Sequence, residues 1–533
     1  MPHPPQAPRR LAALRRLAVV SVLGFASGLP LALTGQALQA WLSVSGVEIA
    51  TIGFLSLVGL PYTFKFLWAP LMDRFECWPR LGRRRGWLVL TQLALAASLG
   101  ALSLASPTGS LQVVALLAVA VAFMSASQDV VVDAYRTDLL PPAERGLGSS
   151  VHVLGYRLAM IVSGGVALIW TDPVAGSGMS WPQVYRLMAM MMVGVAAFSA
   201  LLVPRLPLLA PEDAIDGRPA PGASGNDLRG FVAVAAAVAA GYVFTQALAL
   251  PLVKALAMAG PAPDAITGLK ARWIDLVALL IGIGVTLPLA AWAARKARFE
   301  TLLGGLRGYF AQPGAVVFLL FIVGYKLGDA FAGALMTPFL LQAMAFGSAE
   351  VGVVNKVLGL WLSIGGALLG GALMLRLGLW RALLLFGIGQ SASNLGFWWL
   401  AVKGKGSLPG LTLPAFDWGF VHLAQATPVD GGLLMVIALE NLTGGMGTAA
   451  FLAFLMSLTQ QRFTATQFAM LSAFASIGRV WVGPMAGVLA EAIGWPSFFI
   501  VSIAVSVPAL ALLWPMRPAV QRLEVAAGAP LDD

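Results

Sequence analysis

The sequence predicts an all-α polytopic membrane protein, and three observations support this prediction. Of the 533 residues, 59% are hydrophobic and only 11% are charged, which leaves too little polar surface to cover a soluble domain. Apolar windows of about 20 residues, each long enough to cross a bilayer core, recur along the whole chain. Backbone groups inside a bilayer must be satisfied internally, so we expect these windows to form helices.

We expect about 14 membrane-spanning helices. The expected spans lie near residues 17–42, 49–70, 87–105, 111–135, 147–170, 182–204, 231–257, 273–294, 313–342, 351–375, 380–401, 432–458, 465–490 and 496–514. Most of the 34 Lys and Arg residues lie between spans on one side. This positive-inside pattern predicts that both termini are cytoplasmic. The net charge of +10 then reflects topology, and we predict no nucleic-acid partner. The basic N-terminus lacks a cleavage site, so we interpret it as the cytoplasmic lead into an uncleaved first helix.

The two ends of the chain share short motifs in the same order. "GFASGLPLAL" from Gly24 aligns with "GYKLGDAFAG" from Gly324, and "LMDR" before residue 75 aligns with "LMLR" before residue 377. Both copies start on the same side of the membrane, so the repeat is parallel, like the halves of a major facilitator transporter. We therefore expect a major facilitator fold, built of two parallel six-helix halves plus an inserted central helix pair.

The predicted division of the chain has four parts. Residues 1–204 form the first six-helix half, 205–310 a cytoplasmic linker with an inserted two-helix membrane hairpin, 311–516 the second half and 517–533 a cytoplasmic tail. The alternative for the insert is a pair of amphipathic helices on the cytoplasmic surface, although its apolar runs are long and not one-sided.

The loop between the second and third spans carries an acid followed by arginines. Its charged residues are Asp73, Arg74, Arg83, Arg84 and Arg85. This order resembles the facilitator loop signature that latches the cytoplasmic ends of the two halves, so we predict a gating latch. The alternative is an ordinary positive-inside anchor.

Charged residues inside the predicted spans mark a transport pathway, because each costs about 2.5–3.5 kcal/mol in a membrane. Asp129 and Asp133 lie four residues apart and share one helix face. Repulsion between two such acids favours a proton on one of them, which suits a proton-coupled carrier. Asp329 and Glu440 are further candidates for proton coupling. The alternative for Asp129 and Asp133 is that they pair with Arg157 and Lys65 to hold helices together. For Lys65 itself the alternative interpretation is that it extends to the headgroups.

Amides and cations in the spans suggest a substrate with carboxylates and many hydroxyl or amide groups. The predicted substrate-binding residues are Gln36, Gln39, Gln128, Arg157, Lys326, Asn355, Lys356, Asn441 and Arg479. For Lys326 the alternative is an intrahelical ion pair with Asp329. We predict no metal and no cofactor, because Cys77 is the single cysteine and the three histidines are scattered.

Several of these stretches resemble the AmpG-type muropeptide permeases of the major facilitator superfamily. The matching motifs include "FKFLWAPLMDR", "SASQDVVVDAYRTDLLPPAERG", "VLGYRLAMIVSGG", "YKLGDAF", "EVGVVNK" and "ENLTGGMGTAAF". They cover both halves in order but leave residues 205–310 uncovered. The inserted helix pair is thus a departure from a plain twelve-helix pattern.

This resemblance implies proton-coupled import of anhydro-muropeptides across the bacterial inner membrane for peptidoglycan recycling, which would feed the signal for β-lactamase induction. The expected partners are the muropeptide, protons and the lipid bilayer, with no obligate protein partner. One alternative is an exporter of drugs or organic anions on the same fold. The other is a membrane-embedded glycosyl- or acyltransferase. The segment 403–430 offers Asp417, His422 and Asp430 without a recognisable catalytic arrangement, so we predict that the protein is not an enzyme.

Overall fold

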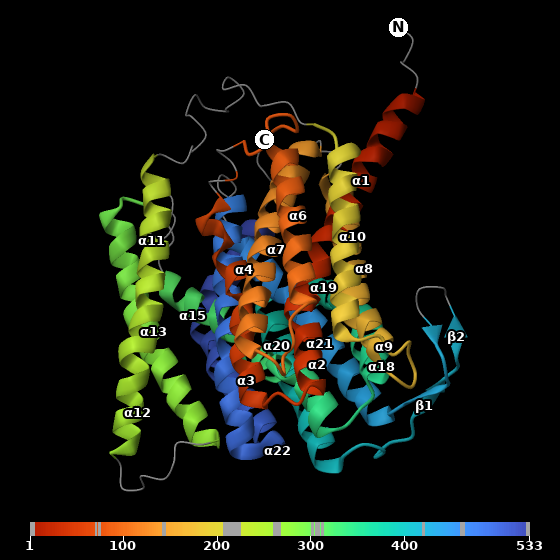
Figure 1. Ribbon diagram of the computed structural model, residues 1–533, viewed down its shortest axis with the longest axis vertical. Helices are drawn as coiled ribbons and strands as arrows, with labels where there is room; N and C mark the ends of the chain where they lie inside the picture. Colours follow the sequence, from red (N-terminus) through yellow and green to blue (C-terminus); the bar gives the residue numbers. More distant parts are fainter. Residues whose placement is uncertain are drawn as a thin grey trace.

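The computed structural model shows a helical membrane protein (Figure 1). It describes residues 6–69, 72, 76–140, 145–205, 225–259, 268–299, 303, 310, 314–417, 422–458 and 464–528. Within these residues, 11 helical segments are long and apolar enough to cross a membrane. The all-α polytopic prediction is confirmed, whereas the number of crossings and the four domain boundaries stay predictions.

The first group of helices covers residues 6–205. Its helical segments are α1 (Gln6–Thr34), α2 (Gln36–Val44), α3 (Ile49–Phe54), η1 (Leu55–Gly59), α4 (Leu60–Phe64), η2 (Lys65–Leu67), α6 (Arg83–Leu102), α7 (Leu111–Leu139), α8 (Arg145–Met160), η4 (Ile161–Val166), α9 (Ala167–Thr171) and α10 (Trp181–Leu201). Local sequence sets where some of them begin. Ser110 caps α7, and Ser180 with Gln183 forms a capping box at the start of α10.

The insert forms two long antiparallel helical passages at one side of the molecule, beside elements of both groups (Figure 1). They consist of α11 (Gly225–Phe244), η6 (Thr245–Ala249) and α12 (Leu250–Met258), followed by α13 (Gly268–Lys296). Two Gly–Thr pairs let them approach closely: a Cβ added at Gly241 would lie 2.0 Å from Thr286 Oγ1, and one added at Gly282 would lie 2.0 Å from Thr245 Oγ1. Small residues at a helix contact are typical of membrane proteins. Both passages are among the candidate membrane spans.

The second group covers residues 314–528. Its segments are α15 (Ala315–Tyr325), α16 (Leu327–Ala334), α17 (Met336–Pro338), η7 (Phe339–Ala343), α18 (Ser348–Val351), η8 (Gly352–Leu358), α19 (Gly359–Leu377), α20 (Leu379–Lys403), α21 (Gly431–Ser457) and α22 (Thr464–Gly528). The long α22 is two passages, because Gly494 has non-helical backbone angles (φ 75°, ψ 163°). A left-handed φ of this kind favours glycine.

Between α20 and α21 the chain forms short β-strands that the sequence analysis did not predict. Antiparallel pairs join β1 (Leu411–Leu413) to β4 (Thr427–Val429) and β2 (Phe416–Asp417) to β3 (His422–Leu423). We call this element the ribbon and the end of the molecule that carries it the ribbon end. The start of α1 lies at the opposite end, which we call the terminal end (Figure 1).

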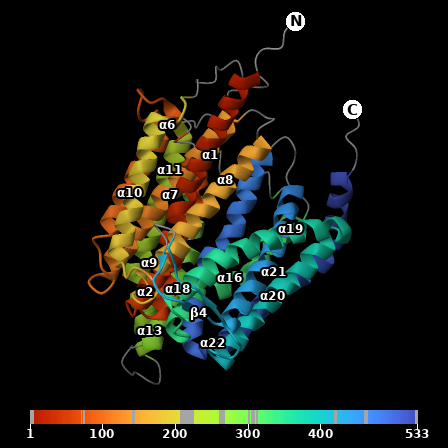
Figure 2. The same cartoon turned by 90° about the vertical axis from the view of Figure 1, so that its right-hand side faces the viewer.

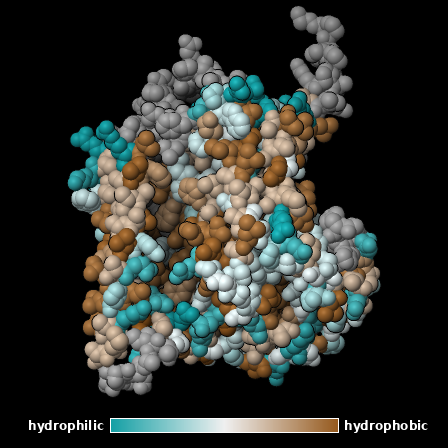
Figure 3. All heavy atoms as spheres, viewed as in Figure 1, coloured by the Kyte–Doolittle hydropathy of each residue, from teal (hydrophilic) through white to brown (hydrophobic). Residues whose placement is uncertain are grey.

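The two groups pack against each other through a shared core. Figure 2 shows α6, α7 and α10 on one side and α19, α20 and α21 on the other. The largest cluster of buried hydrophobic side chains takes residues from both groups, such as Leu29 and Phe339. Apolar side chains also cover much of the outer face (Figure 3), as a surface in contact with lipid requires.

A charged cavity between the two groups

A cavity of about 220 Å³ lies between α8 of the first group and α16, α19 and α21 of the second. It brings together five residues that the sequence analysis selected: Arg157, Lys326, Asp329, Glu440 and Asn441. They come from three helical passages that are distant in the sequence. Convergence of rare intramembrane charges on one cavity is the arrangement expected of a substrate pathway.

Lys326 is held by the second group. It interrupts the helix between α15 and α16, and its Nζ donates hydrogen bonds to Gln390 Oε1 (2.9 Å), Thr448 Oγ1 (3.0 Å) and the Gly444 carbonyl (3.4 Å). Asp329 Oδ2 lies 4.0 Å from the same nitrogen. We call this cluster the lysine site. The intrahelical ion pair is therefore present, but the hydrogen bonds that position the ammonium come from α20 and α21.

Asn441 positions the carboxylate of Glu440, its neighbour on α21. Its Nδ2 donates to Glu440 Oε2 (2.6 Å) and to the Ile437 carbonyl (2.9 Å), while Ser363 Oγ donates to its Oδ1 (2.7 Å). These contacts fix the amide between α19 and α21. Glu440 is thereby held as a hydrogen-bond acceptor beside the cavity.

Arg157 is the charged residue that the first group contributes to this cavity. Within the described part of the chain it makes no hydrogen bond or ion pair. An arginine offers five donors in a planar fork that matches a carboxylate. The cavity thus presents an available guanidinium opposite Asp329 and Glu440, which suits a substrate carrying carboxylates.

A second polar cluster lies within the first group, around Asp129 on α7. Asp129 Oδ2 is 3.9 Å from Lys65 Nζ, and the Asp129 side chain is 16% exposed. Its Oδ1 and both amide atoms of the fully buried Gln128 have no hydrogen-bond partner among the described residues. We call Lys65, Gln128 and Asp129 the aspartate site. A mostly buried acid beside a cation inside a membrane span is a candidate functional group.

Asp133 lies in different surroundings from Asp129. Its side chain is 54% exposed, and its Oδ1 lies 3.3 Å from Arg136 Nη2 on the same helix. The predicted pairing of the two acids with Lys65 holds for Asp129. Arg157 instead lines the cavity described above.

The remaining predicted binding residues are distributed along the interface. Gln39 Nε2 donates to the Ala334 carbonyl (2.9 Å) across the two groups, Asn355 is buried, and Gln36 is half-buried. The side chains of Lys356 and Arg479 lie outside the described residues.

The predicted latch is described in part. Asp73 and Arg74 lie outside the described residues. Arg84 Nε donates to Asp138 Oδ2 (2.9 Å), and this ion pair joins α6 to α7 within the first group. Arg83 and Arg85 lie on the same first turn of α6. The latch thus stays a prediction.

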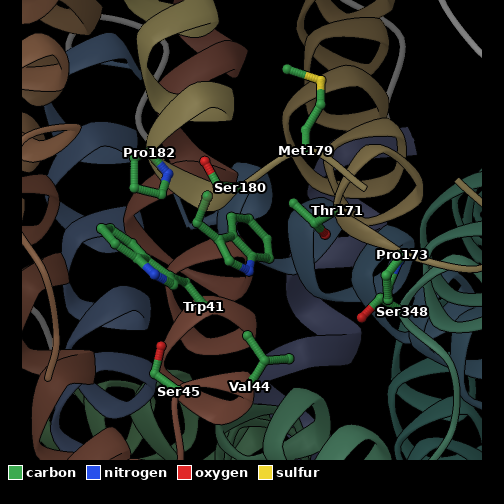
Figure 4. Close-up of a pocket in the computed structure, with 10 residues that line it drawn as sticks. Trp41, Val44, Ser45, Thr171, Pro173, Met179, Ser180, Pro182 and Ser348 are labelled. Atoms are coloured by element: carbon green, nitrogen blue, oxygen red, sulfur yellow. The ribbon is translucent and has the colours of Figure 1, made fainter. Parts of the chain in front are cut away.

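A larger pocket of about 470 Å³ lies at the ribbon end (Figure 4). Its lining includes Trp41, Val44, Thr171, Met179 and Ser348, and none of its lining residues is charged. It lacks the cations and acids that the substrate predictions require, so the smaller cavity is the candidate site.

Sequence reasoning missed Gln390 and Thr448, which accept hydrogen bonds from Lys326, and Ser363, which donates to Asn441. The sequence did contain a signal for Gln390. Gln390 opens the stretch "QSASN", an unusual polar run within the otherwise apolar α20.

Comparison with solved structures shows the same architecture. The structure of a mutant peptide transporter POT in complex with sulfate has a TM-score of 0.60, with 13% identity and coverage of 95% of each chain. An inward-facing bacterial homologue of the human lysosomal transporter Spinster has a TM-score of 0.57, with 14% identity and coverage of 98% of this chain and 99% of that one. At these identities the likeness shows the fold alone. The helices and the charged cavity between two groups define a membrane transporter of the major facilitator fold.

Sequence comparison narrows this class. A family model described as acetyl-coenzyme A transporter 1 matches residues 16–112. The anhydromuropeptide permease of Escherichia coli (strain K12) is 42% identical over 512 residues, covering 96% of this chain and 81% of that protein. A putative transporter AmpG 4 of Rickettsia conorii is 26% identical over 93% of this chain and 95% of its own length. The chain therefore belongs to the anhydromuropeptide permease family.

Proposed function

We propose that this protein imports anhydromuropeptides together with protons, and that the import supplies peptidoglycan recycling and the signal for β-lactamase induction. The observation that carries the proposal is the cavity in which Arg157 of the first group faces Lys326, Asp329 and Glu440 of the second. The name of the 42% identical permease gives the substrate class.

The chemistry of the cavity suits a disaccharide linked to a short peptide. Peptide carboxylates match the Arg157 guanidinium, because an arginine binds a carboxylate through two parallel hydrogen bonds. Asn441, Ser363 and Thr448 line the same cavity. Their amide and hydroxyl groups can exchange hydrogen bonds with sugar hydroxyls and acetamides. Lys326 would contribute its charge from a fixed position.

We assign proton coupling to Asp129. It is mostly buried, and one of its carboxylate oxygens has no hydrogen-bond partner among the described residues. Lys65 lies near the other oxygen at 3.9 Å. A mostly buried carboxylate beside a single cation can alternate between a charged, paired form and a neutral, protonated form. Asp329 and Glu440 are the alternatives, because both lie in the cavity itself.

We propose that the protein lies in the inner membrane with the terminal end in the cytoplasm and the ribbon end in the periplasm. The excess of Lys and Arg in segments at the terminal end supports this orientation. Hydrogen bonds between the two groups gather at the ribbon end, as in Gln39 to Ala334. The structure then corresponds to a state closed toward the periplasm.

Uptake into right-side-out membrane vesicles tests the proposal. Labelled disaccharide-peptide is offered with and without an inward proton gradient, and the unaltered chain should accumulate it only with the gradient. Equal uptake under both conditions would show that import is not coupled to protons. Gradient-driven uptake into inverted vesicles without uptake in right-side-out ones would support the alternative exporter.

A further inference from the structure

Several hydrogen bonds between described residues join the two helix groups at the ribbon end. Gln342 Nε2 donates to the carbonyls of Ser43 (3.0 Å) and Val47 (3.1 Å). These bonds join η7 of the second group to the turn between α2 and α3 of the first group. Two further bonds between the groups use carboxylates, and both carboxylates accept from the backbone at the start of a helical passage.

The first carboxylate is Asp172, which follows α9 and is 7% exposed. Its Oδ1 accepts from the backbone of its own turn, at Val174 (3.0 Å) and Ala175 (2.9 Å). Its Oδ2 accepts from the backbone N–H of Ala349 in the second group (2.9 Å). Ala349 is the second residue of the helical passage 348–374, which begins after Gly347 and has no side-chain cap of its own. The missing cap is supplied by the other group.

The second carboxylate is Glu491, near the end of the first passage of α22. Its Oε1 accepts from the backbone N–H of Ala50 in the first group (2.8 Å). Ala50 is the second residue of α3, whose N-cap Glu48 makes no side-chain cap bond. The Glu48 carboxylate forms an ion pair with Arg272 of the insert instead. This helix start therefore also takes its cap from the other group.

The two contacts occupy equivalent places. Asp172 lies at the ribbon end of the passage α8–α9, the fifth of the first group, and caps the passage that begins with α18, the second of the second group. Glu491 lies at the ribbon end of the first part of α22, the fifth passage of the second group, and caps the passage that begins with α3, the second of the first group. Each contact sits beside a close approach of backbones: a Cβ added at Gly352 would lie 2.7 Å from the Gly165 carbonyl, and one added at Gly53 would lie 2.5 Å from the Gly483 carbonyl. An opening of the ribbon end that separates either pair of passages must break the corresponding cap.

We propose that Asp172 and Glu491 are a pair of latches that hold the ribbon end closed, and that both must release before this end opens. A negative charge at a helix N-terminus is stabilised by the helix dipole and by the N–H groups that lack partners in the helix. Both latches act on one movement of the two groups, so their effects on the population of the closed state combine. This inference concerns closure alone and holds for any substrate.

Thiol labelling of the full chain measures the closure. Cys77, the single cysteine, is first replaced by serine, and Leu168→Cys is added as a reporter. Leu168 is 2% exposed and its Cβ would lie 3.0 Å from a Cβ at Gly352, so it is covered while the ribbon end is closed. A membrane-impermeant maleimide is applied to the ribbon side of oriented vesicles. Asp172→Asn and Glu491→Gln should each raise the labelling rate about two- to tenfold, and the double variant more.

Asp430→Asn is the matched control. Asp430 is also a buried carboxylate at the ribbon end, but its bonds to Gly406 and Leu433 stay within the second group. It should leave the labelling rate unchanged. Unchanged labelling in both latch variants, or an equal rise in the control, would overturn the proposal. Each latch variant keeps the size of the side chain it replaces, so either one alone gives a valid test if the other fails to fold.

Discussion

The lysine site and the aspartate site are both intramembrane charge clusters, but their polar atoms are paired to different degrees. Lys326 Nζ has three hydrogen-bond acceptors on two helices. By contrast, the charged group of the aspartate site is incompletely bonded, because Asp129 Oδ1 has no hydrogen-bond partner among the described residues. Both sites also contain a glutamine with unpartnered amide atoms, Gln390 Nε2 in the lysine site and both amide atoms of Gln128 in the aspartate site. A fully bonded ammonium is fixed in place and contributes to the packing of its group. Unpartnered groups cost stability, and that cost is understandable where a proton or a water must come and go.

The largest effect is expected from Asp129→Asn, which changes the aspartate site and leaves the lysine site intact. Asparagine keeps the shape and hydrogen-bonding reach but cannot cycle a proton. One charge crossing the membrane gains about 2.3 kcal/mol per 100 mV, which is more than tenfold in accumulation. The variant should therefore lose at least tenfold in gradient-driven accumulation of labelled muropeptide while it retains counterflow exchange.

The control for this prediction is Asp275→Asn, which removes a 38% exposed acid of the insert and should accumulate substrate normally. Normal accumulation in Asp129→Asn would transfer the coupling role to Asp329 or Glu440. Loss of accumulation and exchange together would indicate a role in folding.

A smaller loss is expected from Arg157→Gln, which removes the available cation of the cavity. Hydrogen bonds to charged groups contribute about 1.5–3 kcal/mol, so the Kd for peptide-bearing muropeptide should rise by about tenfold or more. Arg186→Gln on the exposed side of α10 is the matched control and should bind normally. An unchanged Kd in Arg157→Gln would show that the substrate carboxylates bind elsewhere.

Lys326→Ala distinguishes a binding role from a structural one at the lysine site. The variant leaves Gln390 and Thr448 without their donor, which should cost about 1–3 kcal/mol of stability and lower the Tm. If the ammonium also contacts substrate, binding of peptide-bearing muropeptide should weaken more than that of the bare disaccharide. Equal weakening for both ligands, with Tm restored by adding Gln390→Leu, would leave a structural role only.

The smallest effect is expected from Asp133→Asn. The Asp133 side chain is half exposed and its ion pair with Arg136 lies on one helix, and exposed pairs contribute up to about 1 kcal/mol. Initial uptake rates should stay within about fivefold of the unaltered chain. A loss as large as that of Asp129→Asn would mean that the two acids act as one unit, and the contrast between their surroundings would be without functional meaning.

Much of the fold and part of the site could be predicted from the sequence. Long apolar windows allow few structures in a membrane, and charges such as Asp129 and Lys326 are rare enough there to stand out. The contacts of these groups could not be predicted. Whether Thr448 or Ser363 faces a cavity depends on helix rotation and packing, and hydroxyl groups are common on buried helix faces. Asp172 and Glu491 were missed because acids near helix ends carry no distinctive pattern until the opposite helix start is seen beside them.

Proton movement driven by substrate tests the central claim most directly. The unaltered chain is reconstituted into proteoliposomes that contain a pH-sensitive dye, and disaccharide-peptide is added outside without any imposed gradient. The account predicts acidification of the lumen that depends on substrate concentration and is absent in Asp129→Asn. Substrate entry without acidification in the unaltered chain would contradict it.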